Sequence, residues 1–324
     1  YGGYLSLAYQ FPDFVDYIEK VTEEFRGIYD IIKDVTPYSG LKVAILNSWG
    51  SLRTWQTHMV AHALWYKQIY SYLGVLESLS GAAVDVSFIS FDDVIKDGVP
   101  VEVDVIINAG DAGTAFSGGE YWTNEKLVTT IRAWIHNGGG FIGIGEPTAW
   151  QHEGHYFQLA TALGVDKELG FSLSTDKYFV TPVEEHFISA DTTQFNFGEG
   201  MKNIFALSEE TEIIEYSNGE VHLSSHPFGE GRAVYIAGLP YTEENTRLLM
   251  RALYYAAHKE EEFHKWHAVN IYCEVHAYPS IQKMAIVNNS MKIQTTVVFD
   301  GEGNSKVVTL EPSEIRWENF SNEG

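Results

Sequence analysis

Hydrophobic positions between residues 41 and 163 alternate between two periods. Four apolar runs have the length of buried strands: 41–49, 84–90, 103–110 and 140–145. Between them, apolar residues recur at steps of three and four over 57–79, 120–137 and 156–163, the spacing of helices that bury one face. Wholly apolar strands that alternate with helices are typical of a parallel sheet covered on both faces. With a further strand at 232–240 and a helix at 242–258, the sequence predicts an α/β fold with at least five parallel strands.

The first 37 residues read as a separate unit. The run YLSLA at 4–8 predicts a short strand, and apolar residues at helical spacing predict a helix over 13–32. Asp13 is the expected N-cap of that helix, directly after Pro12. Because one strand and one helix cannot enclose a core, we expect residues 1–37 to be the last β/α unit of a larger domain.

The pattern changes after Glu260. A charged, aromatic linker, EEEFHKWH, leads into alternating runs separated by turn signals such as Asp300-Gly301. These runs predict a small antiparallel β domain. The expected domains are therefore 1–37, the α/β domain 38–262 and the β domain 263–324. Inside the α/β domain, Ser217-Asn218-Gly219 predicts a hairpin turn.

Charge and composition exclude several classes of protein. The net charge of −23 would repel nucleic acid, which is bound mainly through Lys and Arg. No apolar run approaches the roughly 20 residues of a membrane helix. The N-terminal sequence lacks the basic start and apolar core of a signal peptide. One cysteine, Cys273, cannot form an internal disulfide and fits a reducing compartment, so we expect a cytoplasmic protein that binds neither nucleic acid nor membrane.

Polar residues follow three of the expected strands. Asn47, Asp111 and Glu146 stand at or just after strand ends, and Trp122 lies shortly downstream of Asp111. Ligands of open parallel sheets bind beyond the carboxyl ends of the strands, so these four residues are candidates for a small polar binding site. The plainer interpretation is that Gly, Asn and Asp commonly end strands.

The turn after GGGFIGIG would carry the nucleophile in many α/β enzymes. In Gly143-Ile-Gly145-Glu146-Pro147, glycine stands where a lipase-like elbow needs Ser and an amidotransferase needs Cys. Cys273 lies in the expected β domain instead, although His226 and Glu243 are present downstream. We therefore assign no catalytic residue to this sheet.

Metal and cofactor motifs are also incomplete. The pair His58 and His62 shares a helix face, but Met59 replaces the glutamate of H-E-x-x-H. The pair His152 and His155 has no evident third ligand. The glycines of GGGFIGIG precede or lie within a strand, unlike a dinucleotide fingerprint, and the many carboxylates cannot mark a glycosidase pair. We expect neither a metal nor a cofactor.

Several long stretches together resemble one enzyme family. They are GYLSLAYQFPDFVDYIEKVTEEFR, KVAILNSWGSLRTW, DVIINAGDAGTAFSGGEYW, GGGFIGIGEPTA and FQLATALGVDKELGFSLSTDKY. They resemble the galacto-N-biose/lacto-N-biose phosphorylases, hexosyltransferases that cleave β-1,3-galactosyl-N-acetylhexosamines with phosphate to release α-galactose 1-phosphate. The resemblance implies the end of a TIM-like barrel, a central amidotransferase-like domain and a C-terminal β domain. It also implies that Gly145 occupies the position of an amidotransferase cysteine.

The same resemblance limits what the chain is expected to do. In this family the general acid and most sugar and phosphate contacts lie on the barrel, so none can be assigned here. We therefore expect a structural and assembly role, no turnover by this chain alone, and at least a homodimer. The disaccharide and inorganic phosphate would be partners of the full-length enzyme. A free-standing sugar-binding module is the alternative. For Glu146, whose backbone Pro147 restricts, two roles are open. We favour a carboxylate that accepts hydrogen bonds from backbone N–H groups near 111–113; the alternative is a carboxylate that faces the barrel of the whole enzyme and bonds a sugar hydroxyl or a barrel loop.

Overall fold

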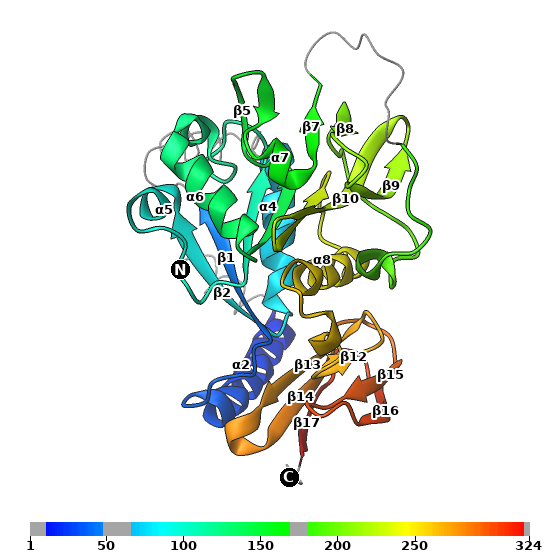
Figure 1. The fold of residues 1–324 in the computed structure, drawn as a ribbon. Coiled ribbons are helices and arrows are strands. Elements are labelled where there is room, and N and C mark those ends of the chain that lie inside the picture. Colours follow the sequence, from blue (N-terminus) through cyan, green and yellow to red (C-terminus); the bar gives the residue numbers. More distant parts are fainter. Residues whose placement is uncertain (1–10, 48–65, 169–179, 321–324) are drawn as a thin grey trace.

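The computed structural model describes residues 11–47, 66–168 and 180–320 (Figure 1). The described α-helices are α2 (Pro12–Ile32), α4 (Tyr66–Ser80), α5 (Phe91–Asp97), α6 (Glu125–His136), α7 (Ala160–Leu163) and α8 (Glu243–Ala256). The strands of the α/β domain are β1 (Leu41–Asn47), β2 (Val84–Ser90), β3 (Val105–Gly110), β4 (Gly140–Gly145), β5 (Ala149–His152), β6 (His155–Phe157), β7 (Val165–Lys167), β8 (Ile204–Ala206), β9 (Glu212–Ser217), β10 (Glu220–Phe228) and β11 (Gly231–Ile236). Among the described helices, none is long and apolar enough to cross a membrane.

The central element is a seven-stranded sheet in the order β2-β1-β3-β4-β11-β10-β9. Its first five strands pair in parallel, which confirms the predicted parallel sheet. β10 and β9 then add antiparallel, because a tight turn at Gly229 joins β10 to β11 and the Asn218-Gly219 turn joins β9 to β10. The parallel strands bring their carboxyl ends to one edge of the sheet.

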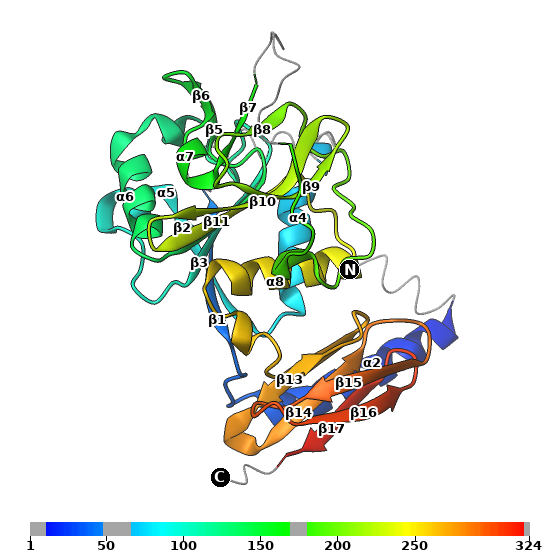
Figure 2. The same ribbon diagram turned by 45° about the vertical axis from the view of Figure 1, so that its right-hand side comes forward.

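Helices α4 and α8 cover one face of the sheet and α6 covers the other (Figure 2). Alternate residues of the central strands form a separate hydrophobic core on each face. Val43 and Ile45 of β1 join the core under α4 and α8. Ala44 and Leu46 of the same strand join the core under α6. Burial on both faces explains why these strands are apolar throughout.

Three elements depart from the prediction. Residues 156–163 form β6 and the single turn α7 in place of one helix, because the N–H groups of Tyr156 and Phe157 are bonded to the Asp166 side chain. The helix predicted at 120–137 begins only at Glu125, where the Asn124 side chain caps it, after a 3₁₀ turn. The short helix α5 was not predicted, although Ser90 and Asp93 form a capping box at its start.

The β domain is antiparallel, as predicted, and is built from two three-stranded sheets. Its strands are β12 (His267–Ala268), β13 (Cys273–Tyr278), β14 (Lys283–Asn288), β15 (Gln294–Phe299), β16 (Ser305–Leu310) and β17 (Ile315–Asn319). The sheets β12-β15-β16 and β13-β14-β17 enclose a core of their own, which includes Val275, Ile286 and Val298.

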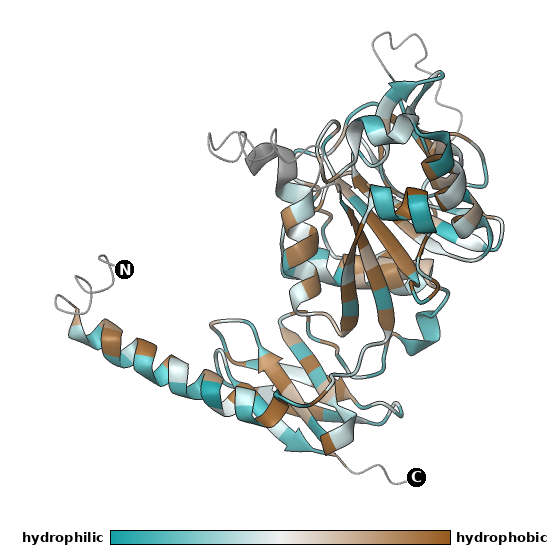
Figure 3. Ribbon diagram, turned by 90° about the vertical axis from the view of Figure 1, so that its left-hand side faces the viewer, coloured by the Kyte–Doolittle hydropathy of each residue, from teal (hydrophilic) through white to brown (hydrophobic). Residues whose placement is uncertain are grey.

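Helix α2 runs beside the β domain and projects beyond it (Figure 3). It starts at Pro12, so proline occupies the first turn and Asp13 is not the N-cap that the sequence predicted. No residue of α2 is buried, and Phe14, Phe25 and Tyr29 are among its exposed aromatic side chains. The hydrophobic residues that recur along α2 are therefore at most partly buried.

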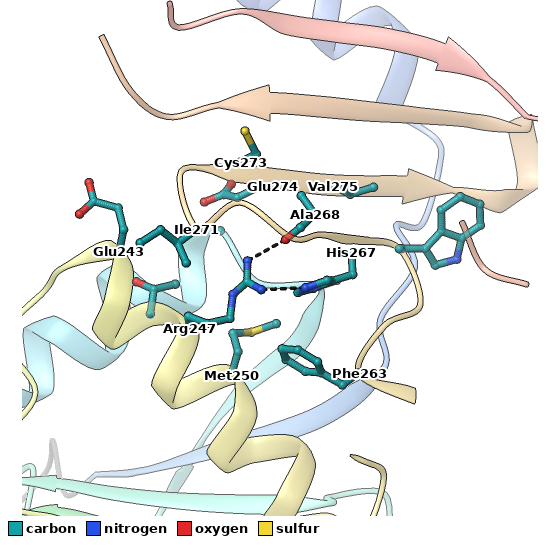
Figure 4. Close-up of a pocket in the computed structure, with 14 residues that line it drawn as sticks. Glu243, Arg247, Met250, Phe263, His267, Ala268, Ile271, Cys273, Glu274 and Val275 are labelled. Atoms are coloured by element: carbon teal, nitrogen blue, oxygen red, sulfur yellow. Dashed lines mark hydrogen bonds between the residues drawn. The ribbon is translucent and has the colours of Figure 1, made fainter. Parts of the chain in front are cut away.

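The two domains meet at a small pocket of about 60 Å³ between α8 and the β domain (Figure 4). Arg247 of α8 donates hydrogen bonds to the carbonyl of Ala268 and to Nε2 of His267, both at 2.7 Å. Arg251, one turn further along α8, bonds Asp191 through Nε at 2.6 Å. Both guanidinium groups lie near the ring of Phe263 in the interdomain linker. Buried polar contacts therefore fix the first strand of the β domain against α8.

Candidate functional site

The candidate residues Asn47, Asp111 and Glu146 lie at the carboxyl ends of three neighbouring strands. Asn47 ends β1, Asp111 follows β3, and Glu146 follows β4. Gly110 and Gly145 end their strands with φ values of 126° and 77°, which glycine adopts without steric cost. The N–H of Glu146 donates to the carbonyl of Gly110 at 3.0 Å, so the two turns are bonded to each other.

Glu146 is the centre of a half-buried hydrogen-bond network. Its Oε2 accepts from the N–H of Ala112 at 2.9 Å, which is the kind of backbone contact that the sequence predicted. Its Oε1 accepts from the Tyr156 hydroxyl at 2.8 Å and from Lys167 Nζ at 2.5 Å. Burial raises the pKa of Glu146, but Lys167, the Ala112 N–H and Tyr156 outweigh it and leave the pKa below its ordinary value. Glu146 is therefore an anion that ties the loop after β3 to β6 and β7.

The pKa of Asp111 is shifted in the direction opposite to that of Glu146. Burial, followed by the negative charge of Glu146, raises its pKa to about 7, with a further contribution from Glu199 and an opposing one from Lys167. The carboxyl group is thus divided between its protonated and ionised forms near neutral pH. Two neighbouring carboxylates with separated pKa values occur at many functional sites and also in purely structural networks.

Lys167 and Tyr156 were not among the residues predicted for this site. Asp166 places both of them, since its carboxylate accepts from the N–H groups of Tyr156, Phe157 and Lys167 at 2.8–3.2 Å. Lys167 Nζ also lies 4.9 Å from the centre of the Tyr156 ring. The one sequence signal was the Asp-Lys pair after Gly164, which by itself does not indicate a contact across 21 residues of chain.

Buried Asn108 and Thr148 fix the shape of the turn that carries Glu146. Asn108 accepts from the N–H of Thr148 at 2.8 Å and donates to the carbonyl of Phe116 at 3.0 Å. Thr148 has a φ of 56°, which is unfavourable for a β-branched residue and requires support from its surroundings. The turn is consequently preorganised, although its apex bears no nucleophile.

Trp122 is separated from the other three candidates by its burial. Its side chain is 1% exposed, its Nε1 donates to the carbonyl of Ser117, and its ring packs edge-on against Phe91. It supports the loop after β3 from the core side. The structure brings Asn47, Asp111 and Glu146 to one edge but shows no surface of Trp122 there.

The histidine motifs do not form a metal centre in the described part of the chain. His155 pairs with Asp166 at 3.0 Å, while His152, its cross-strand neighbour at the turn of the β5–β6 hairpin, lies 3.8 Å from Glu153. Within residues 11–47, 66–168 and 180–320, no three His, Cys, Asp or Glu side chains form a possible metal site. His58 and His62 lie outside the described residues.

Substitutions of the two carboxylates are expected to change stability in opposite directions. At pH 8, Glu146→Gln should lower the free energy of unfolding by about 1.5 kcal/mol, because a charged acceptor of three donors is lost. Asp111→Asn should raise it by about 1 kcal/mol, because the ionised form of Asp111 is disfavoured in the fold. Asp111 favours the folded state at low pH, and this contribution is lost as the pH rises from about 4 towards 7.

Urea denaturation at pH 5 and pH 8 measures both effects. The advantage of Asp111→Asn should be larger at pH 8 than at pH 5. A destabilising effect of Asp111→Asn at pH 8 would contradict the assigned electrostatics.

Comparison with known proteins gives a consistent assignment over the whole chain. The family models described as the central domain, C-terminal domain and N-terminal TIM barrel domain of lacto-N-biose phosphorylase match residues 42–261, 266–318 and 1–40. The 1,3-beta-galactosyl-N-acetylhexosamine phosphorylase Cphy3030 of Lachnoclostridium phytofermentans is 52% identical over 99% of this chain. The phosphorylase of that name from Bifidobacterium longum is 43% identical over 98%. The chain spans only 44% and 47% of the lengths of these two relatives.

Solved structures show the same fold at low sequence identity. The beta-galactosidase from Rahnella sp. R3 aligns with 88% of this chain and 42% of its own, with a TM-score of 0.51 and 15% identity. A catalytic mutant of a GH42 beta-galactosidase from G. stearothermophilus aligns with 94% of this chain and 43% of its own, with a TM-score of 0.50 and 14% identity. At this identity the likeness concerns the fold alone.

Proposed function

The chain belongs to the lacto-N-biose phosphorylase family, and from that premise we propose that it is the non-barrel portion of a β-galactoside phosphorylase. The full-length enzyme would convert a galactosyl-N-acetylhexosamine and phosphate into α-galactose 1-phosphate and the free N-acetylhexosamine. This portion would have a structural and assembly role, with no turnover of its own. Its units would be the end of the barrel at 1–37, the central domain at 38–262 and the β domain at 263–324.

The exposed apolar face of α2 is the observation that carries this proposal. The helix has 21 residues and buries none of them, while Phe25 and Tyr29 are 65% and 62% exposed. Exposed aromatic residues along one helix are costly in water and indicate a partner surface. Since residues 1–40 match the barrel domain of the family, we assign the barrel of the full-length enzyme as that partner.

The chemistry of the sheet edge supports a role without turnover. Phosphorolysis needs a carboxylic acid for the leaving oxygen and cationic or amide donors that hold the attacking phosphate. Asp111 has a suitable pKa of about 7, but Glu146 and Glu199 surround it with negative charge. The nearby cation Lys167 is already bonded to Glu146. A phosphate at this edge would therefore meet carboxylates with no free cation among the residues that shift the Asp111 pKa.

The second candidate function is a free-standing sugar-binding module at the edge formed by Asn47, Asp111 and Glu146. Half-buried carboxylates beside one another favour it, since they can accept hydrogen bonds from sugar hydroxyls. The strength of the existing Glu146 network counts against it, because both oxygens already have donors. Calorimetric titration with galactose, lacto-N-biose and phosphate separates the two candidates. Micromolar binding by this chain alone would contradict the purely structural role.

A chimaera with a supplied barrel tests the proposal directly. The barrel of the 52% identical Lachnoclostridium phosphorylase would be joined upstream of this chain. This chain would thus replace the corresponding part of that enzyme. We expect the chimaera to release galactose 1-phosphate from lacto-N-biose and phosphate, and the chain alone to release none. Phe25→Asp in the chimaera should lower activity about tenfold, the equivalent of about 1.4 kcal/mol of lost stabilisation.

The matched control is Glu24→Asp, an exposed and conservative change in the same helix. It should leave the chimaera active. Equal activity of Phe25→Asp and the unmodified chimaera would show that α2 does not pack on the barrel.

We further propose that the full-length protein is at least a homodimer and acts in the cytoplasm. Light scattering would test the oligomeric state.

A further inference from the structure

A groove lies beside the hairpin between β9 and β10. Figure 1 shows this hairpin near the sheet edge that carries Asp111 and Glu146. The groove has a volume of about 730 Å³ and lies between this hairpin and the segment 195–202. That volume lies within the range of roughly 300–1,000 Å³ typical of sites for small molecules. Glu199, which lines the groove, is also one of the charges that raise the pKa of Asp111, so the groove lies near the edge described above.

One wall of the groove is aromatic. Phe195 and Phe197 stack with their rings 11° from parallel, and the Phe197 ring lies 5.4 Å from the ring of His222. Phe195 and Phe197 are both only partly buried, although they pack against the core under α4 and α8. The wall therefore offers flat apolar surface to the groove.

The other groups that line the groove are polar and include both hydrogen-bond donors and hydrogen-bond acceptors. Glu215 bonds His222 at 2.8 Å, and Glu220 accepts from the N–H of Ile204 at 3.2 Å. In the described part of the chain, each of these bonds uses one carboxylate oxygen, which leaves the second oxygen as an acceptor. Exposed Lys202 and Asn218 supply donors on the same groove.

The segment that forms the aromatic wall is held in place without a ligand. The Tyr70 hydroxyl donates to the carbonyl of Phe197 at 3.1 Å. Gly198 donates to the Asn196 side chain at 3.0 Å, and Met201 donates to the carbonyl of Ala237 at 3.0 Å. A binding surface that is already ordered loses little conformational entropy on binding.

From this geometry we propose that the groove between segment 195–202 and the β9–β10 hairpin is a saccharide-binding subsite. A sugar ring has C–H faces that pack on aromatic rings and hydroxyl groups that both donate and accept. Glu199, Glu215 and Glu220 would repel an anion. Lys202 would repel a simple cation that has no hydrogen-bond acceptors. A neutral polyhydroxylated ligand satisfies both kinds of polar group. This subsite goes beyond the proposed assembly role and requires no turnover.

Titration of this chain with lacto-N-biose, followed by NMR or calorimetry, tests the subsite. We expect weak binding with a dissociation constant of about 1 mM, typical of a shallow and wet site. Lys202→Ala and Asn218→Ala should each weaken binding about fivefold, the effect of one lost hydrogen bond. Both side chains are exposed, so neither change should disturb the fold.

The matched control is Lys96→Ala, an exposed lysine on α5 outside the groove. It should bind the disaccharide as the unmodified chain does. Absence of binding at about ten times the expected constant would overturn the proposal. Binding that Asp111→Asn weakens, while the groove variants leave it unchanged, would also overturn it and would assign the sugar to the neighbouring edge. Either result leaves the barrel chimaera as an independent test of the proposed function.

Discussion

Gly74→Ala is expected to destabilise the α/β domain by about 3 kcal/mol or more, the upper range for overpacking a rigid core. Gly74 lies in the middle of α4, where alanine would ordinarily favour the helix. A Cβ at this position would meet the carbonyl oxygen of Leu239 at 1.8 Å and its carbonyl carbon at 2.9 Å. The clash is with main chain, which cannot rotate away as a side chain can. Packing therefore outweighs helix propensity at this residue.

A hydrogen bond also joins α4 to the segment of Leu239 at this close approach. The hydroxyl of Ser71, one turn before Gly74, accepts from the N–H of Leu239 at 3.3 Å. An alanine would push α4 away from the segment after β11 and break this contact. Urea denaturation followed by circular dichroism measures the loss.

Gly27→Ala is the matched control, because Gly27 is also an interior glycine of a helix. A Cβ there would meet nothing within 4 Å. The substitution should leave the α/β domain unchanged and raise the helicity of α2, since alanine is favoured over glycine by about 1 kcal/mol in exposed helices. Equal stability of Gly74→Ala and the unmodified chain would show that α4 does not approach Leu239 so closely.

The contrast between the two glycines shows how far sequence reasoning extends. Periodicity predicted both α2 and the described part of α4, because an apolar stripe at helical spacing depends only on local sequence. It also predicted the five parallel strands, whose burial on both faces makes them apolar throughout. It could not show that one glycine is buried against a carbonyl and the other exposed, since that depends on residues more than 160 positions apart.

In the candidate site as well, contacts that depend on local sequence were predicted, and contacts that depend on distant residues were not. The position of Glu146 and its contact with the loop after β3 follow from the strand end and from Pro147, so they were predicted. Lys167 was not predicted, because its approach to Glu146 requires the β5–β6 hairpin and the turn α7 to bring β7 back to the edge. Trp122 was assigned to the site because it follows Asp111 closely in sequence, but the 3₁₀ turn directs it into the core.

The contact between the domains is expected to depend strongly on pH through His267. Its Nε2 accepts from Arg247, and this role requires a neutral ring (Figure 4). Burial, followed by the charges of Arg247 and His264, lowers the pKa of His267 to about 3, against a weaker opposing effect of Asp191. In the unfolded chain the pKa of the same histidine would be near its ordinary value of 6.5.

The sign of the effect follows from proton binding. Between pH 6.5 and pH 3 the unfolded state binds a proton at His267 and the folded state does not, so stability falls as the pH falls through this range. A pH of 5 is about 1.5 units below the pKa of this histidine in the unfolded chain. At 1.36 kcal/mol per unit, protonation of the unfolded chain lowers the free energy of unfolding by about 2 kcal/mol. The loss should continue towards pH 3.

His267→Gln isolates this contribution, because the amide oxygen of glutamine can still accept from Arg247 but does not titrate. We expect the difference in unfolding free energy between pH 7.5 and pH 5 to be about 2 kcal/mol smaller in this variant. The pKa values of His186, His226, His258 and His264 are lowered as well, so only the difference between the two proteins belongs to His267. His152→Gln, whose side chain is 44% exposed, is the control and should leave the difference nearly unchanged. If His267→Gln has the same pH dependence as the unmodified chain, His267 is not buried as a neutral acceptor and Arg247 does not hold the two domains through it.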